Sequence, residues 1–88
     1  GLSSIHEQAI NKVSVQPNPF KSNFTINIPD GLWLKITLTD IAGNLLKQEN
    51  IYSSTVLELN NAANGIYLLR LEDLDKRLSK TIKLVRTE

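Results

Sequence analysis

The residues of this chain that could take part in chemistry are few, and they lie far apart. Among 88 residues there is one histidine, His6, and no cysteine. Thiol catalysis, disulfides and cysteine-bound zinc are therefore excluded, and a lone histidine without neighbouring carboxylates does not complete a metal site. The acids fall mostly in turn-like segments, so no pair of carboxylates is arranged for acid–base catalysis. We expect a solvated His6, no catalytic residue, no metal and no cofactor.

Two aromatic residues are the candidates for binding chemistry. Trp33 falls on the polar positions of an alternating stretch, and Tyr52 is the last residue of a more polar predicted strand. An exposed indole can stack on a ligand, whereas a tryptophan beside a turn often covers the end of a β-sandwich. Both interpretations stay open at this point. The alternative function that Trp33 and Tyr52 would support is a non-catalytic carbohydrate- or protein-binding module.

The composition is that of one ordinary globular domain. A hydrophobic content of 41% and a charged content of 22% argue against disorder and against a coiled coil. A net charge of +1 gives no basis for binding nucleic acid or a general membrane surface. No apolar run is long enough to span a bilayer and no signal peptide opens the chain, so direct membrane insertion is not expected. An exported protein would need its signal upstream of Gly1, in a longer polypeptide.

Alternating apolar and polar side chains predict seven short strands. The alternation is strict at residues 23–28 and 32–40, and a more polar strand at 44–52 is typical of a sheet edge. The remaining strands are predicted at 12–16, 55–59, 66–71 and 80–86. Turn residues separate these strands, and no helix is convincing. The pattern indicates an all-β fold, a seven-stranded antiparallel β-sandwich with immunoglobulin-like topology.

The most apolar strand follows the dipeptide Asn64-Gly65. Glycine takes positive φ at little steric cost, which suits a turn at this point. Residues 66–71 are apolar on both parities, and this predicts a central strand that is buried on both faces. Tyr67 opens the strand with Leu69 two residues later, as in a tyrosine corner, where the hydroxyl bonds to the upstream backbone.

Two other segments have the chemistry of turns and connectors. Asp40 begins a tight hairpin turn in which its carboxylate can accept backbone N–H groups, and Gly43 suits the left-handed position. Residues 17–20 are Pro-Asn-Pro-Phe, and the two prolines fix φ and remove two backbone donors. We predict a stiff, extended connector that cannot pair along its length and that places Phe20 over the end of the core. A simple kink that ends a strand is the plainer alternative.

The end of the chain is basic. A charged loop is predicted at residues 72–77, and five basic residues and one acid follow residue 75. Such a run is typical of a solvated strand edge, although it also suits a docking surface. The basic residues are Lys76, Arg77, Lys80, Lys83 and Arg86.

Four of these segments, taken in order, resemble the type A C-terminal sorting domain of the type IX secretion system. The resemblance covers about residues 12–86. It is carried by VSVQPNPF at 13–20, TLTDIAG at 37–43, Leu59 followed by NGIYLLRL at 64–71, and KTIKLV at 80–85.

The resemblance implies a targeting module of exported Bacteroidetes proteins, and not an enzyme. It implies that an upstream cargo crosses the inner membrane on its own signal peptide and that the folded domain is recognised in the periplasm. The outer-membrane translocon would then export the whole protein to the medium or the cell surface. A sortase-like cysteine protease would remove the domain and join the cargo to an anionic lipopolysaccharide.

The resemblance also assigns residues by position. The cut would fall in residues 1–11, which also read as a linker, ahead of a sorting domain at 12–88. Matching leaves open whether the motif residues touch the translocon or only maintain the fold. The sorting-motif or structural residues are Pro17, Asn18, Pro19, Phe20, Asp40, Gly43, Asn64, Gly65 and Tyr67. The candidates for translocon docking are Lys80, Lys83 and Arg86.

Overall fold

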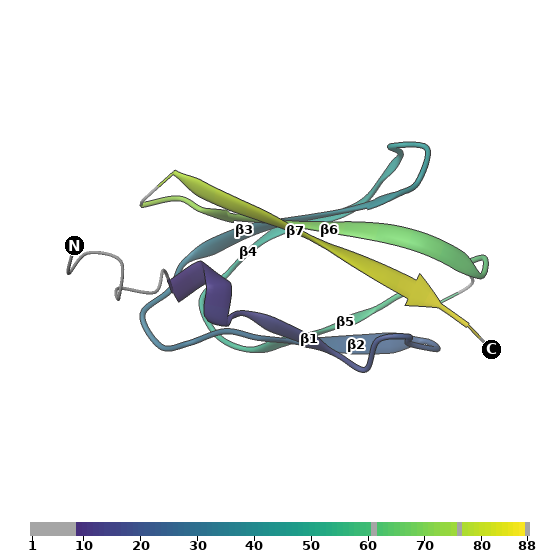
Figure 1. Cartoon of the computed structure of the whole chain (residues 1–88), viewed down its shortest axis with the longest axis horizontal. Helices are drawn as coiled ribbons and strands as arrows, with labels where there is room; N and C mark the ends of the chain where they lie inside the picture. Colours follow the sequence, from purple (N-terminus) through teal and green to yellow (C-terminus); the bar gives the residue numbers. More distant parts are fainter. Residues whose placement is uncertain (1–8, 61, 76, 88) are drawn as a thin grey trace, which may run out of the picture.

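The computed structural model describes residues 9–60, 62–75 and 77–87. Its elements are a 3-10 helix η2 (Ala9–Lys12) and the strands β1 (Ser14–Gln16), β2 (Asn23–Asn27), β3 (Leu34–Asp40), β4 (Leu45–Ile51), β5 (Thr55–Glu58), β6 (Gly65–Asp73) and β7 (Leu78–Arg86). Two antiparallel sheets, ordered β1-β2-β5 and β4-β3-β6-β7, pack face to face (Figure 1). The predicted seven-stranded β-sandwich is confirmed. Its β4 extends the sheet of β3, whereas a constant-type immunoglobulin domain places its fourth strand in the other sheet.

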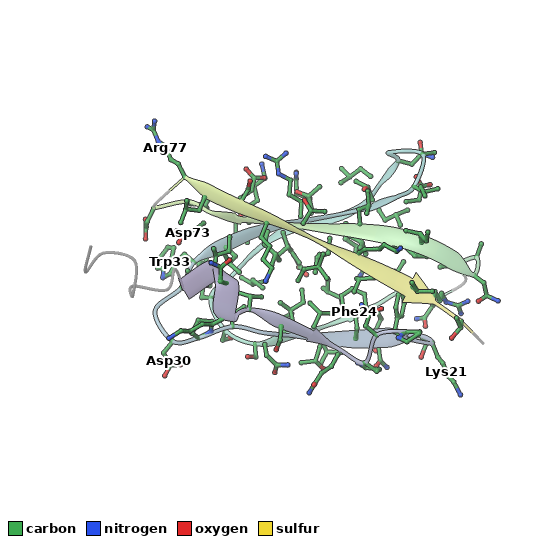
Figure 2. All side chains as sticks on the ribbon, viewed as in Figure 1. Lys21, Phe24, Asp30, Trp33, Asp73 and Arg77 are labelled. Carbon is green, nitrogen blue, oxygen red and sulfur yellow. The ribbon has the colours of Figure 1, made fainter. Side chains whose placement is uncertain are left out.

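The core lies between the two sheets and is built by strict alternation. Phe24 and Ile26 of β2 are fully buried, and so are Leu34, Ile36 and Leu38 of β3. Figure 2 shows Phe24 between the two layers. Because side chains alternate across a strand, the intervening residues point to solvent, as predicted. Burial of each such side chain contributes about 1.5–3 kcal/mol.

β6 is the central strand of the four-stranded sheet, between β3 and β7. Tyr67, Leu69 and Leu71 face the core and are buried. Ile66 and Leu68 point to the other face and are only half-buried. The prediction of burial on both faces is therefore wrong, because no layer formed by the described residues covers the outer face of this sheet.

The hairpin of β6 and β7 is longer than predicted. Glu72 pairs with Ser79 and Asp73 with Leu78, so β6 extends two residues into the predicted charged loop and β7 begins two residues before the predicted last strand. Asp73 is only 3% exposed, and its Oδ1 accepts a hydrogen bond of 3.0 Å from the backbone N–H of Asp75. The carboxylate thus orders the start of a short turn, which charge patterning alone did not reveal.

Packing begins upstream of the predicted domain boundary. The predicted linker includes residues 9–11, but Ala9–Lys12 forms η2, which packs against β7. Ile10 is 3% exposed and joins the core, and this part of the linker assignment is corrected. The reason is apolar burial, because Ile10 fills the side of the core beside β7. The rest of the predicted linker, with His6, lies outside the described residues.

Candidate recognition site

Several motif residues that are distant in sequence meet at one end of the sandwich. Tyr67 of β6 pairs with Asp40 of β3, and Gly65 pairs with Arg86 of β7. Phe20 forms a parallel bridge with Arg86. We call this region the motif end; it comprises Phe20, Asp40, Asn64, Gly65, Tyr67 and Arg86. It lies where β6 begins and β7 ends, near the C-terminus in Figure 1.

The hairpin turn at Asp40 is confirmed. Asp40 Oδ1 accepts hydrogen bonds of 2.9 Å from the backbone N–H groups of Ala42 and Asn44, and Oδ2 accepts one of 2.9 Å from the Asn44 amide. Gly43 has a φ of +92°, as expected for the left-handed position. The hydrogen bonds from the side chain and then the backbone of Asn44 lower the pKa of Asp40. The carboxylate is thus ionised at neutral pH and organises the turn.

The tyrosine corner is also confirmed. The Tyr67 hydroxyl donates a hydrogen bond to the backbone carbonyl of Ala63. Gly65, between them, has a φ of +143°, a value that side chains with a Cβ rarely adopt. The Tyr67 ring packs edge-to-face on Phe20 with centroids 6.2 Å apart, and Phe20 packs on Phe24 at 5.0 Å. The corner therefore joins the crossover before β6 to the aromatic part of the core.

The three basic residues predicted for docking do not share one face of β7. Arg86 is 8% exposed, and its Nη1 donates a 2.9 Å hydrogen bond to Asn64 Oδ1. Lys80 is half-buried, and Lys83 is exposed. Strand alternation puts Lys80 and Arg86 on the core-side face and Lys83 on the opposite face. Arg86 is thus part of the structure of the motif end, and the pattern of charges gave no sign of its partner Asn64.

The connector at residues 17–20 closes the free edge of β7. Asn18 Nδ2 donates to the Lys83 carbonyl at 3.0 Å, and Asn18 Oδ1 accepts from the Val85 N–H at 3.1 Å. The Phe20 N–H donates to the Val85 carbonyl at 2.8 Å, and the Thr87 N–H donates to the Phe20 carbonyl at 2.9 Å. An amide side chain and one backbone residue together act as a short additional strand.

This arrangement corrects the predicted connector. Phe20 is fully buried, as expected. The backbone bends at residues 17–19, so the connector is not extended. The peptide bonds before Pro17 and Pro19 are cis. It also pairs with β7, because the Asn18 side chain carries a donor and an acceptor where the prolines have no N–H. The alternative of a simple kink is excluded by these contacts.

A shallow groove runs along the motif end. One hollow of about 340 Å³ and another of about 230 Å³ share Asp40, Ala63 and Tyr67 in their linings. The groove lies between the β3–β4 turn and the crossover that leads into β6. Ile41, which is 70% exposed, and Leu46, which is 40% exposed, flank it with apolar surface. The lining is mixed, with Asp40, Asn60 and Asn64 beside these apolar side chains.

The aromatic candidates lie at the opposite end of the sandwich. Trp33 precedes β3 and Tyr52 follows β4, beside the paired residues Leu34 and Ile51. Their rings meet edge-to-face at 67° with centroids 4.5 Å apart, and each residue is just over half exposed. Because the rings are not coplanar, they do not form one flat stacking surface.

The described part of the chain has neither the features of a metal site nor those of a membrane-spanning helix. No three His, Cys, Asp or Glu side chains gather there in a way that could hold a metal ion. No helix in residues 9–60, 62–75 or 77–87 is long and apolar enough to cross a membrane.

Comparison with known proteins identifies the family. A family profile described as "Secretion system C-terminal sorting domain" matches residues 14–85. The chain belongs to this family. The match runs from the first residue of β1 almost to the end of β7, so the sandwich is the sorting domain. The resemblance inferred from four short segments is confirmed.

A solved structure agrees with this assignment. It comes from a study of PorZ, described as an essential bacterial surface component of the type-IX secretion system of the human oral-microbiomic Porphyromonas gingivalis. The sequences are 25% identical and the folds superpose with a TM-score of 0.75 over 91% of this chain. The chain spans only 12% of the PorZ chain, so the likeness concerns one domain of that protein. A search of curated proteins found no match.

The sorting domain thus serves as a secretion signal of the type IX system. The protein that carries it is secreted or displayed at the cell surface. The family consists of sorting signals and not of catalysts. The roles of individual motif residues in sorting stay predictions.

Proposed function

We propose that the domain directs an upstream cargo in the same polypeptide through the outer-membrane translocon, which reads the folded motif end. The observation that carries this proposal is the convergence of separate motifs. Asn18 and Lys83 are 65 positions apart yet are joined by a hydrogen bond, and Arg86 reaches Asn64. Such a surface exists only after folding. The signal is then a three-dimensional one, presented in the periplasm.

Within this proposal, the groove beside Asp40 and the exposed Lys83 are the contact elements. Lys83 is the member of the basic trio that faces solvent, whereas Arg86 is buried. Ile41 offers exposed apolar area at the groove, and apolar area drives most protein association. Pro17, Asn18, Pro19 and Phe20 support this surface by closing the β7 edge.

The domain acts as a substrate of a sortase-like cysteine protease and has no catalytic role of its own. A protease needs an accessible, extended backbone at the bond that it cuts. Ile10 is buried and η2 packs on β7, so a cut inside residues 9–12 would require local unfolding. We therefore expect the cleaved bond to lie upstream of Ala9, which narrows the predicted cleavage region from residues 1–11 to the part before residue 9. The cargo is then released or attached at the cell surface.

A reporter export assay tests the docking proposal. Residues 1–88 are fused behind a periplasmic fluorescent protein in a bacterium that has the type IX system. We expect the reporter at the surface or in the medium, and we expect Ile41→Asp or Lys83→Gln to retain it in the periplasm. Both sites are exposed, so the purified variants should keep their denaturation midpoints.

Val56→Asp is the matched control, because Val56 is 56% exposed but lies on β5 of the other sheet. Normal export of Val56→Asp with retention of folded Ile41→Asp would support recognition at the motif end. Equal export of all variants would contradict the proposal that the translocon contacts the motif end. Export of the reporter without the domain would contradict the sorting function itself.

A second candidate function, carbohydrate or protein binding, rests on the exposed Trp33–Tyr52 pair. Sugars stack on exposed aromatic faces, and this pair lies away from the motif end. Glycan-array binding that Trp33→Ala abolishes would favour this function. Absence of binding by the unaltered domain would leave the pair with a packing role only.

A further inference from the structure

β4 is an edge strand whose outer side has no partner among the described residues. It pairs only with β3, at the end of the sheet order β4-β3-β6-β7. Its first six residues, 45–50, are exposed. The backbone N–H and C=O groups on this side are therefore available to another strand. At the opposite edge of the same sheet, Asn18 and Phe20 close the part of β7 from Lys83 onward.

The residues of β4 are complementary to their own antiparallel copy. Gln48 is the central residue of Leu45–Ile51, and Lys47 and Glu49 flank it. In β3 their partners are Leu38 for Lys47 and Ile36 for Glu49, which are core-facing residues of one parity. Lys47 and Glu49 therefore lie on the same face of the sheet. A two-fold axis at Gln48 sets Lys47 of each copy directly opposite Glu49 of the other.

We propose that two copies of this chain associate through antiparallel β4–β4 pairing about an axis at Gln48. The two four-stranded sheets then join into one sheet of eight strands. Directly opposite charges on an antiparallel pair attract each other, and symmetry makes this contact twice. Lys47, Gln48 and Glu49 do not line the groove of the motif end, although Leu46 of β4 flanks it. Association is measured on the isolated chain, so its outcome is independent of the proposed docking function.

Charge also selects the register. A two-fold axis perpendicular to the sheet joins the core-side face of one copy to the core-side face of the other. The residue that pairs with Lys47 must therefore lie on the same face as Lys47, and alternative registers change this partner by two positions at a time. One neighbouring register sets Lys47 against Lys47 of the other copy, and the other sets Glu49 against Glu49. Like charges directly opposite are destabilising. Only the axis at Gln48 makes both contacts attractive.

The association is weak and reversible, because strand edges alone bury less area than a stable interface. The exposed ion pairs are screened by salt. Sedimentation velocity on residues 1–88 over a concentration series should show a monomer–dimer equilibrium that high salt weakens. Lys47→Glu or Glu49→Lys alone should raise the dissociation constant at least about tenfold, because each sets like charges opposite each other twice.

The double variant Lys47→Glu/Glu49→Lys is the decisive control. It exchanges the charges and keeps the attraction, so it should restore the dissociation constant of the unaltered chain. A monomer at every concentration would overturn the proposal. A dimer that tolerates both single variants, or that the double variant fails to restore, would show that another surface is used.

A cross-link locates the axis. The chain has no cysteine, so Gln48→Cys introduces a single thiol. Directly opposite Cβ atoms lie about 4.5–5.5 Å apart, a separation that small side-chain adjustments bring within disulfide range. We expect rapid oxidation of Gln48→Cys to a covalent dimer. Glu58→Cys, exposed on β5 at the edge of the other sheet, should stay monomeric. Equal cross-linking of both variants, or none of Gln48→Cys, would overturn the assigned axis.

Discussion

Asn18 illustrates how one side chain can replace a piece of strand. It sits between two prolines, which cannot donate backbone hydrogen bonds. Its amide supplies both a donor, to the Lys83 carbonyl, and an acceptor, for the Val85 N–H. Aspartate would keep only the acceptor, and alanine would keep neither. The β7 backbone presents one acceptor and one donor to position 18, and only a side chain with both a donor and an acceptor can satisfy the two.

Asn18→Ala should lower the free energy of unfolding by about 1–2 kcal/mol, since two partly solvated hydrogen bonds are lost. Urea denaturation measures the change. Asn23→Ala is a suitable control, because Asn23 is an exposed residue of β2. Equal midpoints for Asn18→Ala and the unaltered chain would contradict the edge-closing role of Asn18.

Asp40 makes the stability of the β3–β4 turn depend on pH. Hydrogen bonds from Asn44 lower its pKa, so the folded state holds the proton less tightly than the unfolded chain. The stabilisation is fully present above the unfolded pKa of about 4 and is lost as pH falls through the lower folded pKa. The thermal midpoint of Asp40→Asn should therefore lie below that of the unaltered chain at neutral pH.

That difference in midpoint should shrink in acid. A scan of thermal midpoints from neutral pH to below pH 3 measures it, with Asp30→Asn as the control for loss of an exposed carboxylate. A difference between Asp40→Asn and the unaltered chain that stays constant over the scan would show that the ionised carboxylate does not hold the turn.

η2 is a short element with a large effect on the fold. Four residues cannot form a stable helix by themselves, so tertiary packing must hold them. The packing comes from Ile10, which is 3% exposed, and from the contact with β7. Val13 follows directly and is also buried, and its N–H donates to the Ile10 carbonyl at 3.3 Å. The sandwich therefore depends on residues ahead of its first strand.

Ile10→Ala should lower the free energy of unfolding by about 2–4 kcal/mol, through lost burial and an unfilled cavity. Leu74→Ala should change it by less than about 0.5 kcal/mol, because Leu74 is 49% exposed in a turn. Guanidinium denaturation of both variants compares them. A cost for Ile10→Ala no larger than for Leu74→Ala would mean that η2 does not stabilise the sandwich.

The folded body as a whole should resist proteolysis from Ala9 onward. Its strands are hydrogen-bonded to neighbouring strands along most of their length. Proteases cut segments that unfold locally at low cost in free energy, and paired strands do not. Brief digestion followed by mass spectrometry should give first cuts upstream of Ala9. A first cut within residues 9–12 would contradict both the packing of η2 and the narrowed position of the release site.

Alternation in the sequence was enough to predict the sandwich, because a period of two assigns each side chain of β2 and β3 to one face. Local turn chemistry also predicted the Asp40 turn and the Tyr67 corner, since both are closed by hydrogen bonds within four residues. Contacts over long sequence separations could not be predicted in this way. Asn64 with Arg86 and Asn18 with β7 depend on which strands become neighbours.

Burial of Ile10 was missed for a related reason. One apolar residue in a polar stretch has no periodicity, and its partner surface appears only after β7 has paired with β6. The exposure of Ile66 and Leu68 likewise follows from the two-layer architecture, in which the second sheet covers only the other face of β6, and not from their own residue types.

The bond from Thr87 to Phe20 has a consequence for biosynthesis. A chain that has been made only as far as residue 80 contains the connector, yet it lacks Lys83, Val85 and Thr87, against which the connector closes. We expect the connector to close fully only in a chain that includes residue 87. Cargo translated from a prematurely stopped message would lack the closed motif end. Under the proposed function, such truncated cargo would stay in the periplasm, so export would select for completely translated proteins.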